Sequence, residues 1–97
     1  MEKRIGVVAV LVTGKDSIPA LNAVLSDYSE IIFGRQGLPF KNKGIHVISL
    51  VVEGDTDQIG AMTGRIGRLK GIQVKSVLTQ YKEYREDTNE EEEPGFH

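Results

Sequence analysis

Two stretches of this chain are apolar on both of their alternating sets of side chains, and this feature limits its possible folds more than any other. A strand with one face in water alternates apolar and polar residues, whereas a strand covered on both faces does not. In the stretch Ile45–Val52, one set is His46, Ile48, Leu50 and Val52, and the other is Ile45, Val47, Ser49 and Val51. The stretch Arg4–Thr13 has the same character. Both are therefore predicted to be central strands.

Length and composition exclude several classes of protein. Ninety-seven residues make one domain, with no room for a second core. The absence of cysteine excludes disulfides, thiolate metal sites and cysteine nucleophiles. No apolar run approaches the ~20 residues that a membrane helix needs, and the first residues show no signal peptide pattern. We therefore expect a cytoplasmic protein with no membrane partner.

Two amphipathic helices are predicted between the strands. Asp16 or Ser17 can cap the first helix, and Pro19 falls in its first turn, where a missing N–H does no harm. Asp55 with Gln58 resembles a capping box before the second helix, and Gly71 is expected to end it. Each helix repeats apolar residues at i, i+3, i+7 and i+10, which are Ile18, Leu21, Leu25 and Tyr28 in the first helix and Ile59, Met62, Ile66 and Leu69 in the second.

The two halves of the chain repeat each other at a constant offset, and each half is strand–helix–strand. The second strand, Ile31–Phe40, contains Gly34, Gly37 and Pro39, which favour an edge or a bulge. The last strand, Ile72–Gln80, alternates as an edge strand should. The pattern predicts an α+β, ferredoxin-like βαββαβ sandwich over residues 1–81, with two helices on one face of a four-stranded antiparallel sheet. The predicted strand order is fourth, first, third, second.

Two helices can cover only one face of this sheet. The other face carries an apolar set from each central strand, and an open apolar face of this kind favours a partner subunit. We therefore expect the chain to pair with itself, as a homodimer or homotetramer.

The charge of the chain is divided unevenly. Residues 1–82 carry eleven Lys/Arg and seven Asp/Glu, a net of +4, whereas residues 83–97 carry one Arg and seven acidic residues, a net of −6. With few apolar residues and four consecutive glutamates, residues 82–97 are predicted to be a disordered acidic tail. A solubilising terminus is favoured over an acidic arm that competes for a basic surface.

A glycine-flanked arginine is one candidate for ligand binding. Arg35 lies between Gly34 and Gly37, and Lys41 and Lys43 follow in the next loop. An arginine fork binds carboxylate or phosphate groups bidentately, so Arg35, Gly37 and Lys41 are candidate ligand-binding residues. A solvated loop, or an ion pair across a subunit boundary, explains the same residues equally well.

The remaining residues do not indicate a metal site, catalysis or RNA binding. His46 has no second ligand nearby, so a hydrogen-bonded structural histidine is favoured over a metal ligand or a pH-sensitive group at a subunit interface. Gly60, Gly64 and Gly67 each weaken a helix, and close packing is expected to compensate; approach of a ligand or a neighbouring subunit is the alternative. No nucleophile–base pair, paired carboxylates or phosphate loop is visible, so we expect no catalytic residue, no metal, no cofactor and no enzyme. The central strands carry no aromatic residues for RNA.

Several motifs between residues 3 and 80 together resemble those of a known family. They are Gly34-Arg35-Gln36-Gly37-Leu38-Pro39-Phe40, Gly44, Ile48-Ser49, Val52-Glu53-Gly54-Asp55-Thr56-Asp57, Thr63-Gly64-Arg65-Ile66-Gly67-Arg68-Leu69 and Gly71-Ile72-Gln73-Val74-Lys75-Ser76. On these residues the chain resembles the small regulators of the iron-only hydrogenase system, and the acidic tail lies outside the resemblance. The family is ACT-like and similar to the C-terminal domain of the nickel-responsive regulator.

The resemblance implies a regulatory or sensor role, with a small-molecule effector or a hydrogenase-maturation protein as partner. The turn Thr13-Gly14-Lys15-Asp16 resembles the place where ACT domains bind amino acids at an interface, which makes Thr13, Gly14 and Asp16 candidate ligand-binding residues. The nickel site is not carried over, because this chain has only two histidines and no cysteine. No DNA-binding segment precedes the first strand, so no direct contact with nucleic acid is expected. The alternative function is a structural or adaptor subunit without a ligand.

Overall fold

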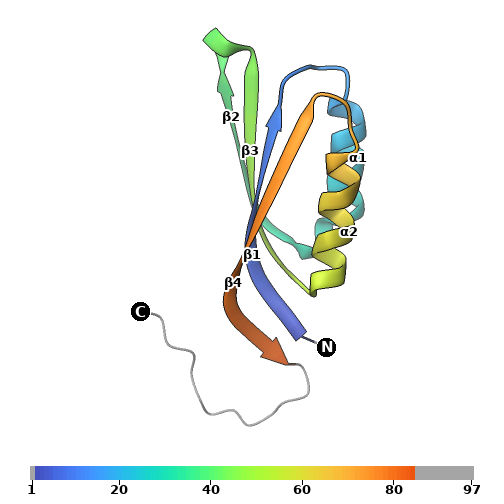
Figure 1. Ribbon diagram of the computed structural model, residues 1–97, viewed down its shortest axis with the longest axis vertical. Helices are drawn as coiled ribbons and strands as arrows, with labels where there is room; N and C mark the ends of the chain where they lie inside the picture. The colour runs from blue at the N-terminus through green and yellow to red at the C-terminus, as the bar shows by residue number, and fades with distance from the viewer. Residues whose placement is uncertain (1, 85–97) are drawn as a thin grey trace.

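The computed structural model describes residues 2–84, which form one sheet and two α-helices (Figure 1). Two single-turn 3-10 helices flank the second strand, at Ser29–Ile31 and Lys41–Lys43. The elements in chain order are β1 (Glu2–Val12), α1 (Ile18–Asp27), β2 (Ile32–Phe40), β3 (Ile45–Gly54), α2 (Thr56–Gly67) and β4 (Ile72–Tyr84).

The sheet confirms the predicted fold class and strand order. Its four strands lie in the order β2-β3-β1-β4, and every neighbouring pair is antiparallel. The two runs that are apolar on both sets, β1 and β3, are the central strands. Both helices lie on the same side of the sheet and run in opposite directions (Figure 1). The chain therefore has the ferredoxin-like α+β architecture.

The core lies between the helices and one face of the sheet. Val8 of β1 pairs with Leu50 of β3, and both side chains are fully buried. The helices contribute the predicted apolar faces, to which the structure adds Val24 of α1. The residues of this core are Val8, Val10, Val12, Leu21, Val24, Leu25, Ile31, Leu50, Val52, Ile59, Met62, Ile66 and Ile72.

The helix ends agree with the sequence in one case and differ in two. Asp55 and Gln58 form the expected capping box, with Gln58 N–H donating to Asp55 Oδ1 at 2.7 Å. Ser17 occupies the N-cap position of α1, but its hydroxyl donates to the Lys70 carbonyl at 2.8 Å instead of capping the helix. The prediction that Gly71 ends α2 was wrong: the helix ends at Gly67, and Gly71 serves the following turn with φ 75°.

The last strand is longer than predicted and is irregular where it passes the end of β1. Arg4 of β1 pairs with Lys82 of β4, and Gly6 pairs with Leu78. Four residue steps along β4 therefore lie opposite two along β1. Thr79 secures this irregularity, because its hydroxyl donates to the Ile5 carbonyl at 2.7 Å and its own carbonyl accepts from Arg4 at 2.6 Å. The strand continues to Tyr84, opposite Glu2. The predicted tail began at residue 82, so its boundary was wrong for residues 82–84, which belong to β4. Residues 85–97 lie outside the described residues.

An exposed ion pair joins the two helices. Arg65 Nη1 of α2 lies 3.1 Å from Asp27 Oδ2 at the end of α1, and the guanidinium carbon lies 5.6 Å from the centre of the Tyr28 ring. Tyr28 and then Asp27 raise the pKa of Arg65 above its ordinary value. The guanidinium is therefore charged throughout the physiological pH range, and this contact does not make stability depend on pH near neutrality.

Candidate functional site

The uncovered face of the sheet has an apolar centre on β1 and β3 that extends onto both edge strands, with polar residues at its margins. Paired residues of antiparallel strands share a face, so the register identifies its members. Val7 of β1 lies between Val51 of β3 and Val77 of β4, and Val47 of β3 lies between Leu11 and Leu38. We call this surface the open face; its apolar residues are Ile5, Val7, Ala9, Leu11, Leu38, Phe40, Ile45, Val47, Val51 and Val77.

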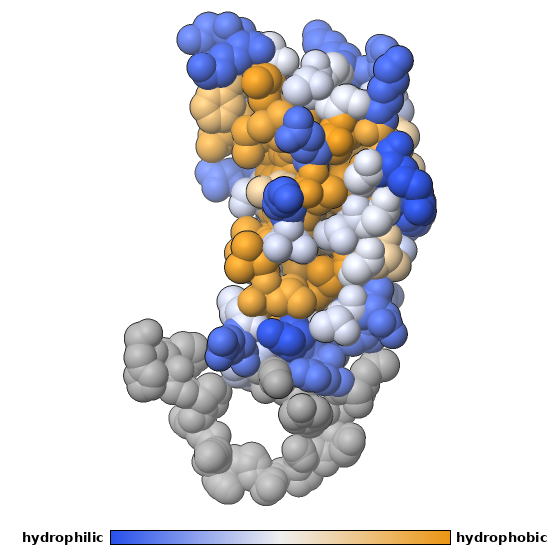
Figure 2. All heavy atoms as spheres, in the orientation of Figure 1, coloured by the Kyte–Doolittle hydropathy of each residue, from blue (hydrophilic) through white to orange (hydrophobic). Residues whose placement is uncertain are grey.

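Large apolar side chains of the open face are strongly exposed. Five of them keep between 41% and 68% of their surface, with Val77 the most exposed. Figure 2 shows apolar residues gathered over the middle of the molecule with a few hydrophilic residues among them, while hydrophilic residues lie at the upper corners and along the outer edge of the helices. The middle row is occupied by the small residues Ala9 and Ser49, which face each other across β1 and β3. A second apolar surface could approach the sheet closely there.

The first candidate turn, between β1 and α1, is bound to the turn between α2 and β4. Thr13 donates both its backbone N–H and its hydroxyl to the Gly71 carbonyl, each at 2.9 Å. Gly14 has open space where a side chain would lie, and Asp16 is exposed. Thr13 therefore has a structural task, whereas Gly14 and Asp16 remain accessible to a ligand.

The second candidate, Arg35, lies in a groove between β2 and α1. Arg35 is opposite the buried Leu50, so it lies on the helix side of the sheet, at its edge. Its side chain is exposed, and within residues 2–84 the guanidinium has no hydrogen bond or ion pair. The groove has a volume of about 410 Å³, and its lining residues are Asn22, Leu25, Ser26, Ser29, Ile32, Gly34 and Arg35.

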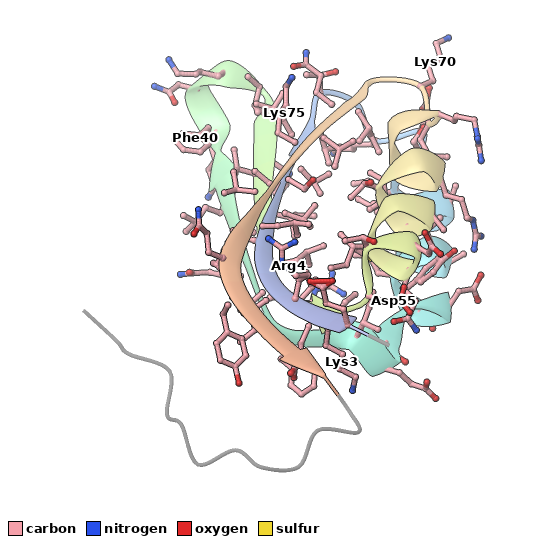
Figure 3. The ribbon with its side chains drawn as sticks, turned by 60° about the horizontal axis from the view of Figure 1, so that its bottom comes forward. Lys3, Arg4, Phe40, Asp55, Lys70 and Lys75 are labelled. Carbon is pink, nitrogen blue, oxygen red and sulfur yellow. The ribbon has the colours of Figure 1, made fainter. Side chains whose placement is uncertain are left out.

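The remaining candidates are Gly37, within β2, and Lys41, at the end of the molecule where β2 turns into β3. Lys41 begins the 3-10 turn after Phe40 and is exposed. Figure 3 shows Phe40, Lys70 and Lys75 at this end, and Lys3 and Asp55 at the other. Lys41 is six residues beyond Arg35, or about 20 Å along an extended strand. Gly37 lies on β2 opposite Ile48, so it separates the two cations and does not join them.

Two expectations about single residues were wrong. His46 is exposed, and the described part of the chain offers its imidazole no hydrogen bond. At Gly60 and Gly64 a Cβ would meet no packed neighbour within 4 Å, so close packing does not explain these two glycines. Only Gly67 is close-packed, since its Cβ would lie 3.3 Å from Val74. Residues 2–84 contain no group of His, Asp or Glu side chains that could hold a metal ion.

The groove also shows what the sequence alone did not reveal. Asn22 and Ser26 are four residues apart, so they lie on one side of α1, next to the buried Leu25. Their spacing could have identified a polar strip on the helix. It could not have shown that Arg35 lies across from that strip, because this depends on how β2 returns along the sheet edge.

Fold and comparison together define the class of protein. The four-stranded sheet with two helices on one face is a ferredoxin-like domain. The model of the TM1266-like family ("Iron-only hydrogenase system regulator, putative") matches residues 4–76, and the chain belongs to this family. TM1266 from Thermotoga maritima is similar in structure, with a TM-score of 0.77 and 32% identity over 80% of this chain and 99% of TM1266.

More distant structures share the fold alone. A protein of unknown function from Galdieria sulphuraria has a TM-score of 0.55 at 13% identity, over 81% of this chain and 46% of that protein. A formyltetrahydrofolate deformylase from Pseudomonas putida KT2440 has a TM-score of 0.58 at 7% identity, over 79% of this chain and 29% of the deformylase. No curated protein matches this sequence. None of the helices within residues 2–84 is long and apolar enough to span a membrane.

Proposed function

We propose that this chain is a small, non-enzymatic regulatory module of the iron-only hydrogenase system that acts in the cytoplasm as a homo-oligomer. Membership of the regulator family supports both the link to the iron-only hydrogenase system and the regulatory role. The proposal of a homo-oligomer rests on the open face, which the helices leave uncovered. In this role the module responds to a small effector or contacts a hydrogenase-maturation protein.

A second copy is the occupant that best suits the open face. The face spans four strands and about six residues of β3, or roughly 20 Å by 20 Å. Its projected area of ~400 Å² is in the range where apolar patches on soluble proteins are often functional. The face is flanked by Lys75 at one edge and Gln36 at the other, both in the row of Ala9 and Ser49. A two-fold axis parallel to the strands would place Lys75 of one copy over Gln36 of the next and keep the two lysines apart.

The oligomer is tested by placing a charge in the middle of the open face. Val51 is 44% exposed in the isolated chain, so Val51→Lys can send its ammonium group into water without unfolding a monomer. The same charge in a dimer interface would be desolvated and unpaired, at a cost of several kcal/mol. We expect sedimentation velocity to show a dimer or larger for the parent at micromolar concentration, and a monomer for Val51→Lys.

The matched control is Ala61→Lys, which adds the same residue to the exposed side of α2. It should sediment like the parent, and circular dichroism should show all three proteins folded. A monomeric parent, or a Val51→Lys protein that assembles like the parent, would contradict the proposal.

The regulatory role is tested by screening for effectors. A ligand that binds only the folded protein raises its melting temperature in proportion to the logarithm of ligand excess. We expect at least one class among amino acids, other small carboxylates and nucleotides to stabilise the protein. If none does, and maturation proteins do not bind either, a structural subunit becomes the better description.

A further inference from the structure

We infer that the groove between α1 and β2 binds a small organic monocarboxylate with a short apolar body, and that Arg35 receives the carboxylate. This inference rests on the proposed role as an effector-responsive module and adds a place and a chemical class for the effector. It uses the helix side of the sheet edge, and therefore does not depend on the open face or on the turn at Thr13.

The charge of the groove points to a single anionic group. Among residues 2–84, Arg35 is the only charged residue that lines it. Within the described residues its guanidinium has no acceptor, so the donors of its fork are available to a ligand. A carboxylate matches that fork in geometry as well as in charge, because two parallel N–H···O bonds can form.

The rest of the lining suits a short apolar body with a polar rim. Leu25 is almost fully buried and Ile32 is half-buried, so together they provide an apolar floor. Ser26 and Ser29 add hydroxyl groups to the lining, which can donate hydrogen bonds to an anion held by Arg35. The volume of about 410 Å³ lies in the range usual for small-molecule sites, which is roughly 300–1,000 Å³.

The shape of the groove disfavours larger anions. The groove is lined by Asn22 and Ser26 from α1 and by Gly34 and Arg35 from β2, so it lies between one helix and one edge strand. A phosphodiester chain would need further cations along its path, but Lys41 lies about 20 Å away along the strand direction. A dicarboxylate would leave its second charge over the apolar floor. One negative charge matches Arg35, and a few methylene groups match Leu25 and Ile32.

The test compares hexanoate with hexanamide, which has the same length and no charge. Titrations are followed by amide chemical shifts of the full chain up to about 50 mM, which detects Kd values in the millimolar range. We expect hexanoate to shift the amides of Ser26, Ser29, Gly34 and Arg35 in a saturable way. Hexanamide should bind about tenfold more weakly or worse, and acetate, which lacks the apolar body, should also bind more weakly.

Substitutions separate the groove from a general surface effect. Arg35→Ala should abolish the saturable shifts, and Arg35→Lys should weaken them nearly as much because lysine loses the bidentate geometry. Arg68→Ala removes an exposed arginine outside the groove and should change nothing. Ser26→Phe fills the groove while leaving Arg35 intact and should block hexanoate, whereas Ala23→Phe on the same helix lies outside the groove and should not.

The inference is overturned if hexanoate causes no saturable shifts in the parent, or if those shifts lie elsewhere or survive in Arg35→Ala. Such a result leaves the proposed oligomer untouched, since assembly is measured separately by sedimentation. Conversely, a monomeric parent that still binds hexanoate through Arg35 would contradict the oligomer and keep the groove.

Discussion

Gly6 is the residue whose missing side chain matters most to the sheet. It lies in β1 just after the irregular pairing with β4. A Cβ there would lie 2.8 Å from the Val77 carbonyl oxygen and 2.6 Å from Leu78 Cδ2. The leucine could move, but the carbonyl belongs to the paired backbone of β4 and cannot move without breaking the ladder. Gly6→Ala is therefore expected to lower the free energy of unfolding by about 2–3 kcal/mol.

Chemical denaturation of Gly6→Ala beside Gly37→Ala measures this effect. Gly37 also lies in a strand, but a Cβ there would be 4.0 Å from Ile48 and meets only ordinary contact. Gly37→Ala should leave stability unchanged or raise it slightly, because alanine has less freedom in the unfolded chain. Equal denaturation midpoints for the two variants would show that β4 adapts at Gly6.

At the residue scale, the sequence predicted the chemistry of Arg35 but not its neighbours. The flanking glycines identified an arginine that could receive an anion. Its distance from Lys41 and its position across from Ser26 follow from tertiary structure. For His46 the sequence misled in another way. Its apolar strand predicted burial, but His46 lies near the start of β3 and is exposed.

The helix α2 contains two glycines that the described residues do not explain. Gly60 and Gly64 are exposed, with open space around them. Alanine is favoured over glycine in a helix interior by about 1 kcal/mol. We therefore expect Gly60→Ala and Gly64→Ala each to raise the free energy of unfolding by ~1 kcal/mol.

Thermal melts and sedimentation of the same two variants show whether these glycines contact a neighbouring subunit. If both variants are more stable and assemble like the parent, the glycines serve no contact between copies. If stability rises but the oligomer weakens, a neighbouring subunit approaches α2 there. A loss of stability without loss of assembly would contradict the expected helix effect.

At the element scale, periodicity predicted helix faces better than helix ends. Ile59, Met62 and Ile66 are buried as their spacing predicts, and the capping box at Asp55 marks where α2 begins. The end was misplaced because Leu69 continues the apolar spacing, although it follows the helix and packs against the core from the turn. Spacing alone cannot distinguish a last helical turn from a loop residue that points the same way.

The whole molecule follows from one pattern, that of two strands apolar on both sets. That pattern placed β1 and β3 at the centre and predicted the open face, because two helices cannot cover both sides of a four-stranded sheet. The irregularity between β1 and β4 left no such signal. It depends on Thr79 holding the Ile5 carbonyl across the strands, and a threonine in an edge strand is ordinary in any sequence.

The acidic end of the chain supplies a last prediction at this scale. Residues 85–97 carry one arginine and six acidic residues, so their removal changes the formal charge from −2 to +3. If this segment is the solubilising tail that its composition predicts, a chain ending at Tyr84 should melt within about 2 °C of the parent, because 1 kcal/mol shifts the melting temperature of such a domain by roughly 4–8 °C. Sedimentation at about 150 mM salt should show the same oligomer as in the parent, since charges more than about 8 Å apart are largely screened there.

The matched truncation ends at Thr79 and removes the part of β4 that pairs with Glu2, Lys3 and Arg4. Its melting temperature should fall by several degrees, because the end of β1 loses its partner strand. Calorimetry of both truncations beside the parent separates the two contributions. If ending the chain at Tyr84 costs as much as ending it at Thr79, residues 85–97 contribute to the folded body, and the prediction of a solubilising tail is wrong.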